Sequence, residues 1–428
     1  MLLDENIPLL DLVLALSDTL DLASPKLTGH HLEVAYIAGE LAKEYGLSGE
    51  QQIELVMAGA LHDIGALSLA EKTALMEFEV PNPSMHSEMG YRLMKTFAPF
   101  SGLAELVRFH HVEWNDGEGL DRCGQLVPPG SHILHLADRI SALRRRDEHV
   151  LNQVEDIRER ITAESGTMFM PDLVDAFARL SEKQAFWLNA ASPNIVATLL
   201  QNREPQAVSL GKPGLLALAE FFARIIDFRS KLTATHSAGV SAVGEALGEL
   251  AGFSDLNCRM MRIAGYLHDL GKLVVPQELL EKPGKLTKDE YNIIYSHPFF
   301  THKALQRIRG FDTIDAWASS HHERLNGRGY PSHPEKDLGP GARMLAVADV
   351  FTAIMEDRPY HKDIPVKTAL QIIQQQADSL ELDKDVTALL KRNLARINTV
   401  RLKAQRTAEK AYRCFHLNSA SPSEGKGG

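Results

Sequence analysis

The sequence predicts an all-α protein built from two helical bundles in tandem. Apolar residues recur at helical spacing after His236, at Val240, Val243 and Leu247, whereas strand-like alternation is scarce along the chain. In addition, one ordered set of histidines and aspartates occurs twice at matched spacing, which indicates two copies of one module. A length of 428 residues is sufficient for two or three domains.

Each copy of the repeated set has seven members. The second copy consists of His236, His268, Asp269, His297, His321, His322 and Asp349. The first copy consists of His30, His62, Asp63, His86, His110, His111 and Asp138. The step from the first His to the His-Asp pair is 32 residues in both copies (30 to 62, 236 to 268). Only the step from that pair to the single His differs, 24 residues against 29 (62 to 86, 268 to 297).

The residue types of this set suit metal binding. Imidazole and carboxylate groups on a helical frame can hold one or two transition metals. The Asp of the His-Asp pair can bridge two metals, whose shared hydroxide can attack phosphorus, so hydrolysis of a phosphoester is the natural use. A lone His-Asp dipeptide carries no information, but seven positions in matched order are hard to explain by coincidence. In the first copy only His30, and not His31, keeps the helical register with Val34 and Ile37.

Composition narrows the class of protein. The formal net charge is −10, so nothing favours binding to a nucleic-acid polymer or to an anionic membrane surface. The N-terminal MLLDENIPLLDLVLAL is acidic where a signal peptide starts basic, and no stretch of about 18 apolar residues occurs. Cys123, Cys258 and Cys414 are scattered, which predicts a reducing compartment, the cytoplasm.

The best linker candidate is QNREPQAVSLGKPG at residues 201–214, because it carries two prolines and two glycines between periodic stretches. We therefore expect a first domain at 1–205 and a second at 206–415. The small polar residues that end the chain predict a disordered tail at 416–428.

Several motifs of the second copy resemble an HD-GYP domain over roughly residues 215–400. They are HDLGK at 268–272, EKPGKLT at 281–287, HHERLNGRGYP at 321–331, ADVFTAI at 348–354 and DRPY at 357–360. The resemblance implies an all-α fold and a centre of two or three divalent metals such as Fe or Mn. It also implies hydrolysis of a cyclic dinucleotide, usually cyclic di-GMP and in some members 3′,3′-cyclic GMP-AMP, to the linear dinucleotide.

Carried over by position, the seven residues of the second copy are expected to be metal ligands, with Asp269 essential to catalysis. Lys272 is expected to meet the scissile phosphate, and Gly329-Tyr330-Pro331 to shape the rim of the site. Arg358 is expected to contact a phosphate or a base, because its planar fork can donate twice. Without the motifs, Lys272 and Arg358 would be ordinary surface charges.

Two positions depart from the family pattern. Leu232 stands where three-metal members have a Glu one turn before the first His, which favours a two-metal site. Asn326 stands where Asp is common, and this loop change is expected to matter little.

The first copy resembles a degenerate HD domain. It keeps every ligand type, but Ala66 replaces the lysine, and no Gly-Tyr-Pro or Arg-Pro-Tyr follows. We expect a domain that can bind metal and that regulates, dimerises or acts on another phosphoester. The run Arg144-Arg145-Arg146 is either an anion site or a solvated helix face.

The leading hypothesis is a cyclic-dinucleotide phosphodiesterase. A cyclic-dinucleotide sensor without hydrolysis and a general HD nucleotide phosphohydrolase remain as alternatives, and Lys272 with the Gly-Tyr-Pro loop favours the first. The sequence leaves open the base preference, the metal, the input signal, and whether the chain forms a homodimer or an intramolecular domain contact.

Overall fold

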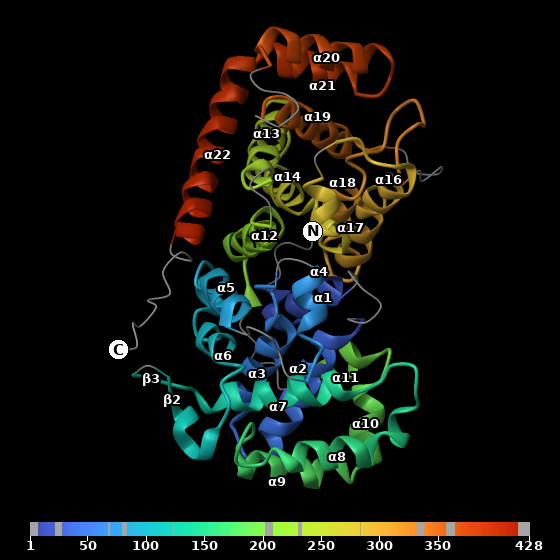
Figure 1. Cartoon of the computed structure of the whole chain (residues 1–428). Coiled ribbons are helices and arrows are strands. Elements are labelled where there is room, and N and C mark those ends of the chain that lie inside the picture. The colour runs from blue at the N-terminus through green and yellow to red at the C-terminus, as the bar shows by residue number, and fades with distance from the viewer. Residues whose placement is uncertain are drawn as a thin grey trace. The chain divides into compact units, whose positions relative to one another are not determined.

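The structure is a computed structural model that describes residues 7–21, 28–66, 69–78, 84–122, 124–201, 209–229, 233–282, 284–331, 338–356 and 364–417. It divides into two compact units between Leu210 and Gly211. Helices make up nearly all of the regular structure in both units, so the predicted all-α class is confirmed (Figure 1). The predicted boundary at 205/206 lies outside the described residues. So does the predicted tail, apart from its first two residues, which close the last helix.

The first unit contains eleven α-helices among its described residues. They are α1 Leu9–Asp21, α2 His30–Glu44, α3 Gly49–Leu61, α4 Leu69–Ala74, α5 Ser84–Met94, α6 Ala104–Arg108, α7 Pro129–Leu143, α8 Val154–Ala163, α9 Pro171–Ser181, α10 Gln184–Ala190 and α11 Ile195–Gln201. Two short antiparallel pairs join β1 (Ile7–Pro8) to β4 (Ser209–Leu210) and β2 (Asp121–Arg122) to β3 (Gln125–Leu126). Three 3₁₀ turns complete the unit, at Ala98–Phe100, Asn115–Leu120 and Val150–Asn152.

All the regular structure that is described in the second unit after Gly211 is helical. Its helices are α12 Lys212–Asp227, α13 His236–Leu250, α14 Asp255–Leu267, α15 Gln277–Leu280, α16 Lys288–Tyr295, α17 His297–Leu305, α18 Asp312–Ala318, α19 Pro340–Ile354, α20 Val366–Asp378, α21 Lys384–Arg392 and α22 Leu394–Leu417. A 3₁₀ turn, η4, spans Leu270–Val274.

Each unit contains its own pair of packed helices that positions the His-Asp dipeptide. In the first unit α2 packs on α3 and α7, and in the second α13 packs on α14 and α19. A Cβ added at Gly265 of α14 would lie 2.5 Å from Ser241 Cα, and one at Gly59 of α3 would lie 2.8 Å from Ala35 Cα. Glycine at these positions therefore lets the paired helices approach closely, three residues before the histidine that ends each helix.

Helix boundaries follow local sequence signals. Ser48 caps α3 in a capping box with Gln51, and Thr287 caps α16 in the same way with Glu290. The apolar stripes predicted after the first histidine of each copy are buried in the structure, including Ile37 of α2.

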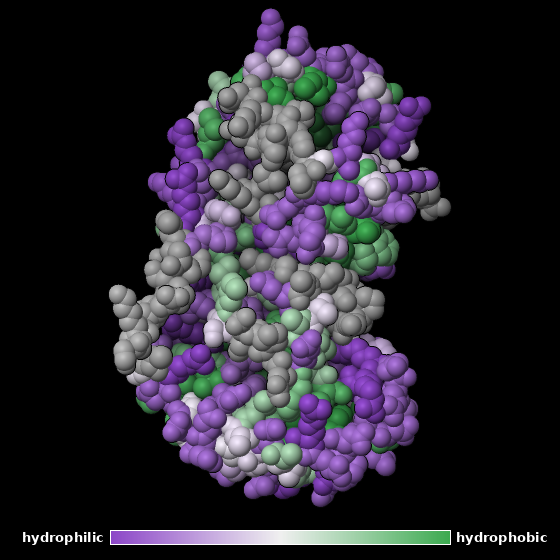
Figure 2. Space-filling view, in the orientation of Figure 1, coloured by the Kyte–Doolittle hydropathy of each residue, from purple (hydrophilic) through white to green (hydrophobic). Residues whose placement is uncertain are grey.

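The described surface is mixed in character. On the face drawn in Figure 2, hydrophilic side chains predominate and hydrophobic ones form small patches. None of the helices in the described ranges is long and apolar enough to cross a membrane.

Candidate metal centres

All seven predicted ligands of the second copy lie together in the second unit. His236 begins α13, His268 and Asp269 follow α14, and His297 begins α17. The paired histidines lie in the turn after α18, and Asp349 lies inside α19. Six of the seven are buried, and only His322 is partly exposed.

Asp269 joins two groups of histidines through its two carboxylate oxygens. Its Oδ2 lies 3.2 Å from His268 Nε2 and 4.0 Å from His236 Nε2. Its Oδ1 lies 3.3 Å from His297 Nε2 and 3.9 Å from His321 Nε2. Donors on one metal at roughly 2.1 Å stand about 3.0–3.4 Å apart, so the shorter of these separations match shared coordination. Asp269 therefore faces both groups of histidines, one with each carboxylate oxygen.

Asp349 completes both groups. Its Oδ1 lies 3.1 Å from His236 Nε2, and its Oδ2 lies 3.9 Å from His322 Nδ1. The carboxylate thus faces a histidine of each group.

The backbone fixes which ring nitrogen faces the cluster. The Nδ1 atoms of three histidines donate to carbonyl oxygens three residues earlier in the chain: His268 to Gly265 at 2.8 Å, His297 to Ile294 at 2.7 Å and His321 to Ala318 at 2.6 Å. A carbonyl only accepts, so Nδ1 carries the proton and Nε2 is left as a ligand.

Burial makes this cluster a fit for cations. It lowers the pKa of His322 to about 3 and that of His321 well below its usual value, with neighbouring histidines adding to the shift at His321. Neutral imidazoles are the form that binds metal. His268 Nε2 and Asp269 Oδ1 are buried without a hydrogen-bond partner. Such orphaned acceptors are costly unless an ion or a proton satisfies them, so these residues fit divalent metals.

Sequence reasoning missed Glu356, which lies two residues after α19. Its Oε2 is 3.0 Å from His236 Nδ1, on the ring edge opposite Nε2. Gln405 of α22 donates to Glu356 Oε1 at 2.6 Å, and Arg401 donates to Gln405 at 2.5 Å. Burial lowers the pKa of His236, but Glu356 and Asp349 outweigh it and hold the value at about 10.

Asp227, the last residue of α12, was also missed. It is buried, accepts a hydrogen bond from Ser237 at 2.9 Å, and has its pKa raised to about 7 by burial. The sequence repeat could have pointed to Asp227, because an aspartate stands nine residues before the first histidine in both copies: Asp227 before His236 and Asp21 before His30.

The predicted substrate-handling residues are placed only in part. Lys272 Nζ lies 2.6 Å from Asp269 Oδ2, so the ammonium reaches the centre of the cluster. Tyr330 lies over His322, with ring centroids 4.6 Å apart, and stacks on Tyr295 at 4.2 Å. Arg358 and Leu232 lie outside the described residues.

The Gly-Tyr-Pro loop packs against the paired histidines. A Cβ at Gly329 would lie 2.4 Å from Arg324 N, so no side chain fits there, and Pro331 follows Tyr330 through a cis peptide bond. Asn326 donates to Ser379 O at 3.0 Å and receives a bond from its own loop, so it ties the loop to the end of α20.

The first copy assembles a similar cluster. His62 and His110 donate through Nδ1 to carbonyl oxygens three residues earlier, as in the second copy. Asp63 Oδ2 lies 3.2 Å from His62 Nε2, and Asp63 Oδ1 lies 3.4 Å from His86 Nε2. The orphaned buried atoms are His30 Nε2, His62 Nε2, His110 Nε2, Asp63 Oδ1 and Asp138 Oδ1. These residues also fit a divalent metal.

Two contacts distinguish the first copy. His30 Nδ1 lies 3.0 Å from the hydroxyl of Ser141, where His236 has a carboxylate partner. Arg139, which is fully buried, donates to Asp138 Oδ2 at 2.5 Å and to the backbone oxygens of Leu75 and Phe78 at 2.9 and 3.2 Å. The guanidinium of Arg139 therefore binds Asp138 Oδ2 and connects this carboxylate to the segment after α4.

The basic run after α7 is already paired. Arg144 donates to both oxygens of Glu33, at 2.6 and 2.8 Å, and Arg146 donates to the same carboxylate at 3.2 Å. Arg145 pairs with Glu148 at 2.7 Å. These ion pairs argue against the run as an anion site.

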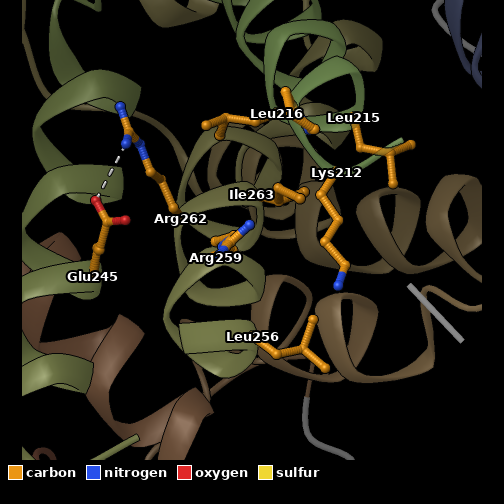
Figure 3. Close-up of a pocket in the computed structure, with 9 residues that line it drawn as sticks. Lys212, Leu215, Leu216, Glu245, Leu256, Arg259, Arg262 and Ile263 are labelled. Carbon is orange, nitrogen blue, oxygen red and sulfur yellow. Dashed lines mark ion pairs between the residues drawn. The ribbon is translucent and has the colours of Figure 1, made fainter. Parts of the chain in front are cut away.

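A separate cavity of about 300 Å³ lies among α12, α13 and α14 (Figure 3). Much of its wall is apolar, from Leu215, Leu256 and Ile263, and Arg262 pairs with Glu245 at 3.5 Å. Its lining residues do not include the candidate ligands, so it is not part of the metal centre.

Comparison with known proteins agrees with this architecture. Models of the HD domain match residues 27–143 and 220–386. The 3′3′-cGAMP-specific phosphodiesterase 1 of Vibrio cholerae is 29% identical over 85% of this chain and 86% of its own length. Phosphodiesterase 3 of the same specificity and organism is 31% identical over 66% of this chain and 60% of its own length.

Other matches cover a smaller part of the chain or concern the fold. The cyclic di-GMP phosphodiesterase response regulator RpfG of Xanthomonas campestris is 37% identical over 40% of this chain and 46% of its own length. A crystal structure of a cyclic GMP-AMP specific phosphodiesterase of Vibrio cholerae superposes with a TM-score of 0.65 at 23% identity, over 91% of this chain and 98% of that one. The chain therefore belongs to the HD-GYP family and carries two HD domains in tandem.

Proposed function

We propose that the chain is a metal-dependent phosphodiesterase that hydrolyses a cyclic dinucleotide to the linear dinucleotide at the second copy. The observation that carries this proposal is Asp269, whose two oxygens face two separate histidine groups. Two divalent metals held by these groups would supply an activated water and positive charge beside the phosphate. The first metal would also be coordinated by His236, His268 and Asp349. The second would also be coordinated by His297, His321 and His322.

The chain's own residues would handle the phosphate. Lys272 would donate to a phosphoryl oxygen as negative charge develops, because its ammonium already reaches the cluster. Tyr330 would line the entrance beside His322, the most exposed of the ligands. Both residues favour hydrolysis over a sensor that only binds the nucleotide, and the packed Gly-Tyr-Pro loop weighs against a general nucleotide phosphohydrolase.

We propose 3′3′-cyclic GMP-AMP as the preferred substrate and cyclic di-GMP as the second. The support is the share of this chain that each relative matches. The relative named for cyclic GMP-AMP matches 85% of the chain, whereas RpfG, named for cyclic di-GMP, matches 40%. Incubating the purified chain, loaded with Mn²⁺ or Fe²⁺, with both dinucleotides and following the linear product tests this order. Release of linear product from neither would contradict the proposed function.

The first copy would hold metal without hydrolysing the dinucleotide. Metal binding is supported by the buried histidine and aspartate atoms that have no hydrogen-bond partner. The lack of hydrolysis is supported by Ala66, which replaces the lysine, and by the ion pair between Arg139 and Asp138. Such an ion would stabilise the first domain, because unpaired buried histidines and aspartates are costly. The free thiols of Cys258 and Cys414 support a cytoplasmic location.

A further inference from the structure

A cavity of about 200 Å³ opens beside the cluster of the first copy. Its wall includes Ser84 and Ser87 from the first turn of α5, Arg108 from the end of α6, His111, and Arg122 from β2. Elements that are far apart in the sequence thus bring two arginines and two hydroxyls to one opening. The motif comparison had suggested that the first copy lacks groups for handling phosphate, but these arginines lie outside the motif positions.

The lining residues of the cavity carry a net positive charge, although Arg108 Nη1 also lies 4.0 Å from Glu105 Oε2 outside the lining. Glu88, on the same wall, accepts from Arg108 Nε at 2.8 Å and from Arg92 Nε at 2.9 Å, so one carboxylate is shared by two guanidinium groups. Arg122 Nη2 donates to the neutral hydroxyl of Ser84 at 3.3 Å. The lining residues therefore carry two positive charges and one negative charge.

The cavity adjoins the metal-ligand cluster directly. His111 lines it, and His111 Nε2 lies 3.1 Å from His86 Nε2. Ser87 Oγ lies 3.4 Å from the same His86 nitrogen. The orphaned atoms Asp63 Oδ1 and His110 Nε2 belong to the same group of donors, which lie within 4.8 Å of one another. A ligand in the cavity would thus lie at the edge of the cluster.

We propose that this cavity is a binding site for a phosphate group, as inorganic phosphate or a small phosphomonoester. Arg122 would donate to the phosphate oxygens, because its planar guanidinium group matches that geometry, and the serine hydroxyls would add neutral donors. Arg108, which pairs with Glu88 at 2.8 Å, would add positive charge to the wall. The volume is below the roughly 300–1,000 Å³ of pockets for drug-sized ligands, so a cyclic dinucleotide is too large to fill it. This inference goes beyond the proposed function, because it gives the first copy a ligand of its own.

The test is isothermal titration of the full-length, metal-loaded chain with inorganic phosphate and, separately, with glycerol 3-phosphate. Arg122→Gln should weaken binding of the ligand tenfold or more, since it removes a charged donor from an exposed two-residue strand. Arg179→Gln is the matched control, because Arg179 is exposed, on α9, and pairs with Glu44 away from the cavity. Binding of both ligands would assign the site to phosphomonoesters, and binding of inorganic phosphate alone would assign it to the free ion.

Variants of the second copy show which of the two copies binds the phosphate. An Asp269→Ala chain should keep the binding that depends on Arg122, and Arg122→Gln should leave cyclic-dinucleotide turnover unchanged. Unchanged affinity in Arg122→Gln would overturn the proposal. So would binding that Asp269→Ala abolishes and Arg122→Gln retains, because the phosphate would then lie in the second copy. Neither result depends on whether the chain hydrolyses cyclic dinucleotides.

Discussion

The carboxylate of Glu356 lies 3.0 Å from His236 Nδ1, while Nε2 of the same ring faces Asp349 at 3.1 Å. A carboxylate partner fixes the ring and raises the basicity of the ligand nitrogen. In the first copy a hydroxyl, that of Ser141, takes the corresponding place at His30. The two copies therefore differ in the support given to their first histidine.

We predict that Glu356→Gln lowers metal affinity of the second copy by about 10–100-fold, as expected for loss of a carboxylate behind a ligating histidine. Activity measured against free Mn²⁺ should shift to higher metal concentration and recover in excess metal. Glu409→Gln makes the same chemical change on exposed α22 and should leave the curve in place. A curve that Glu356→Gln does not move would show that this carboxylate has no role in metal binding.

Lys272→Ala should leave the metal content and the melting temperature close to wild type but lower kcat about 10²-fold, by analogy with loss of one oxyanion donor. The physical reason is that the ammonium reaches the Asp269 carboxylate and would stabilise charge on the phosphate. Single-turnover kinetics would separate the chemical step from binding. An unchanged kcat would remove Lys272 from the reaction.

The metal count follows from the donor set. We expect about two ions in the second copy, because the donors form two groups joined by Asp269 and Leu232 supplies no carboxylate. Elemental analysis of a full-length Asp63→Ala chain, in which the first copy has lost the carboxylate that corresponds to Asp269, should read close to that number. Three ions per chain in that variant would contradict the prediction.

Gly265→Ala should destabilise the second domain by about 1–3 kcal/mol, because the added methyl would meet the backbone of Ser241 at 2.5 Å and force α13 and α14 apart. Gly102→Ala is a control in the first unit, since a Cβ there meets nothing within 4 Å. Thermal denaturation of both variants measures the difference. Equal melting temperatures would mean that the helix pair can adjust without cost.

The clustering of the candidate ligands could be predicted from the sequence because helical register and chain spacing constrain it, whereas their role as metal ligands stays a prediction. His30 rather than His31 was predicted by its register with Val34 and Ile37, and the structure places His30 Nε2 3.3 Å from Asp138 Oδ1. The fold class followed from the same periodicity and is confirmed. The carried-over roles of Lys272 and the Gly-Tyr-Pro loop remain predictions that the geometry supports.

The supporting residues could not be predicted in this way, because their roles arise from tertiary contacts. Gln405 reaches Glu356 across 49 residues, and no motif links α22 to the first histidine. Arg122 of β2 and Arg108 of α6 line one cavity, and no motif in the sequence connects the two. The sequence shows that Arg139 follows Asp138 where Val350 follows Asp349, so the difference between the copies is visible there. The ion pair between Arg139 and Asp138 could be found only in the structure.

The central claim is that the second copy performs hydrolysis and the first does not. The most direct measurement compares initial rates of 3′3′-cyclic GMP-AMP and cyclic di-GMP hydrolysis by Asp269→Ala and Asp63→Ala, with circular dichroism to verify folding. Asp269→Ala should abolish turnover, because it removes the carboxylate that faces both histidine groups. Asp63→Ala should retain a substantial fraction of wild-type turnover. A folded Asp63→Ala chain as inactive as Asp269→Ala would contradict this division between the two copies.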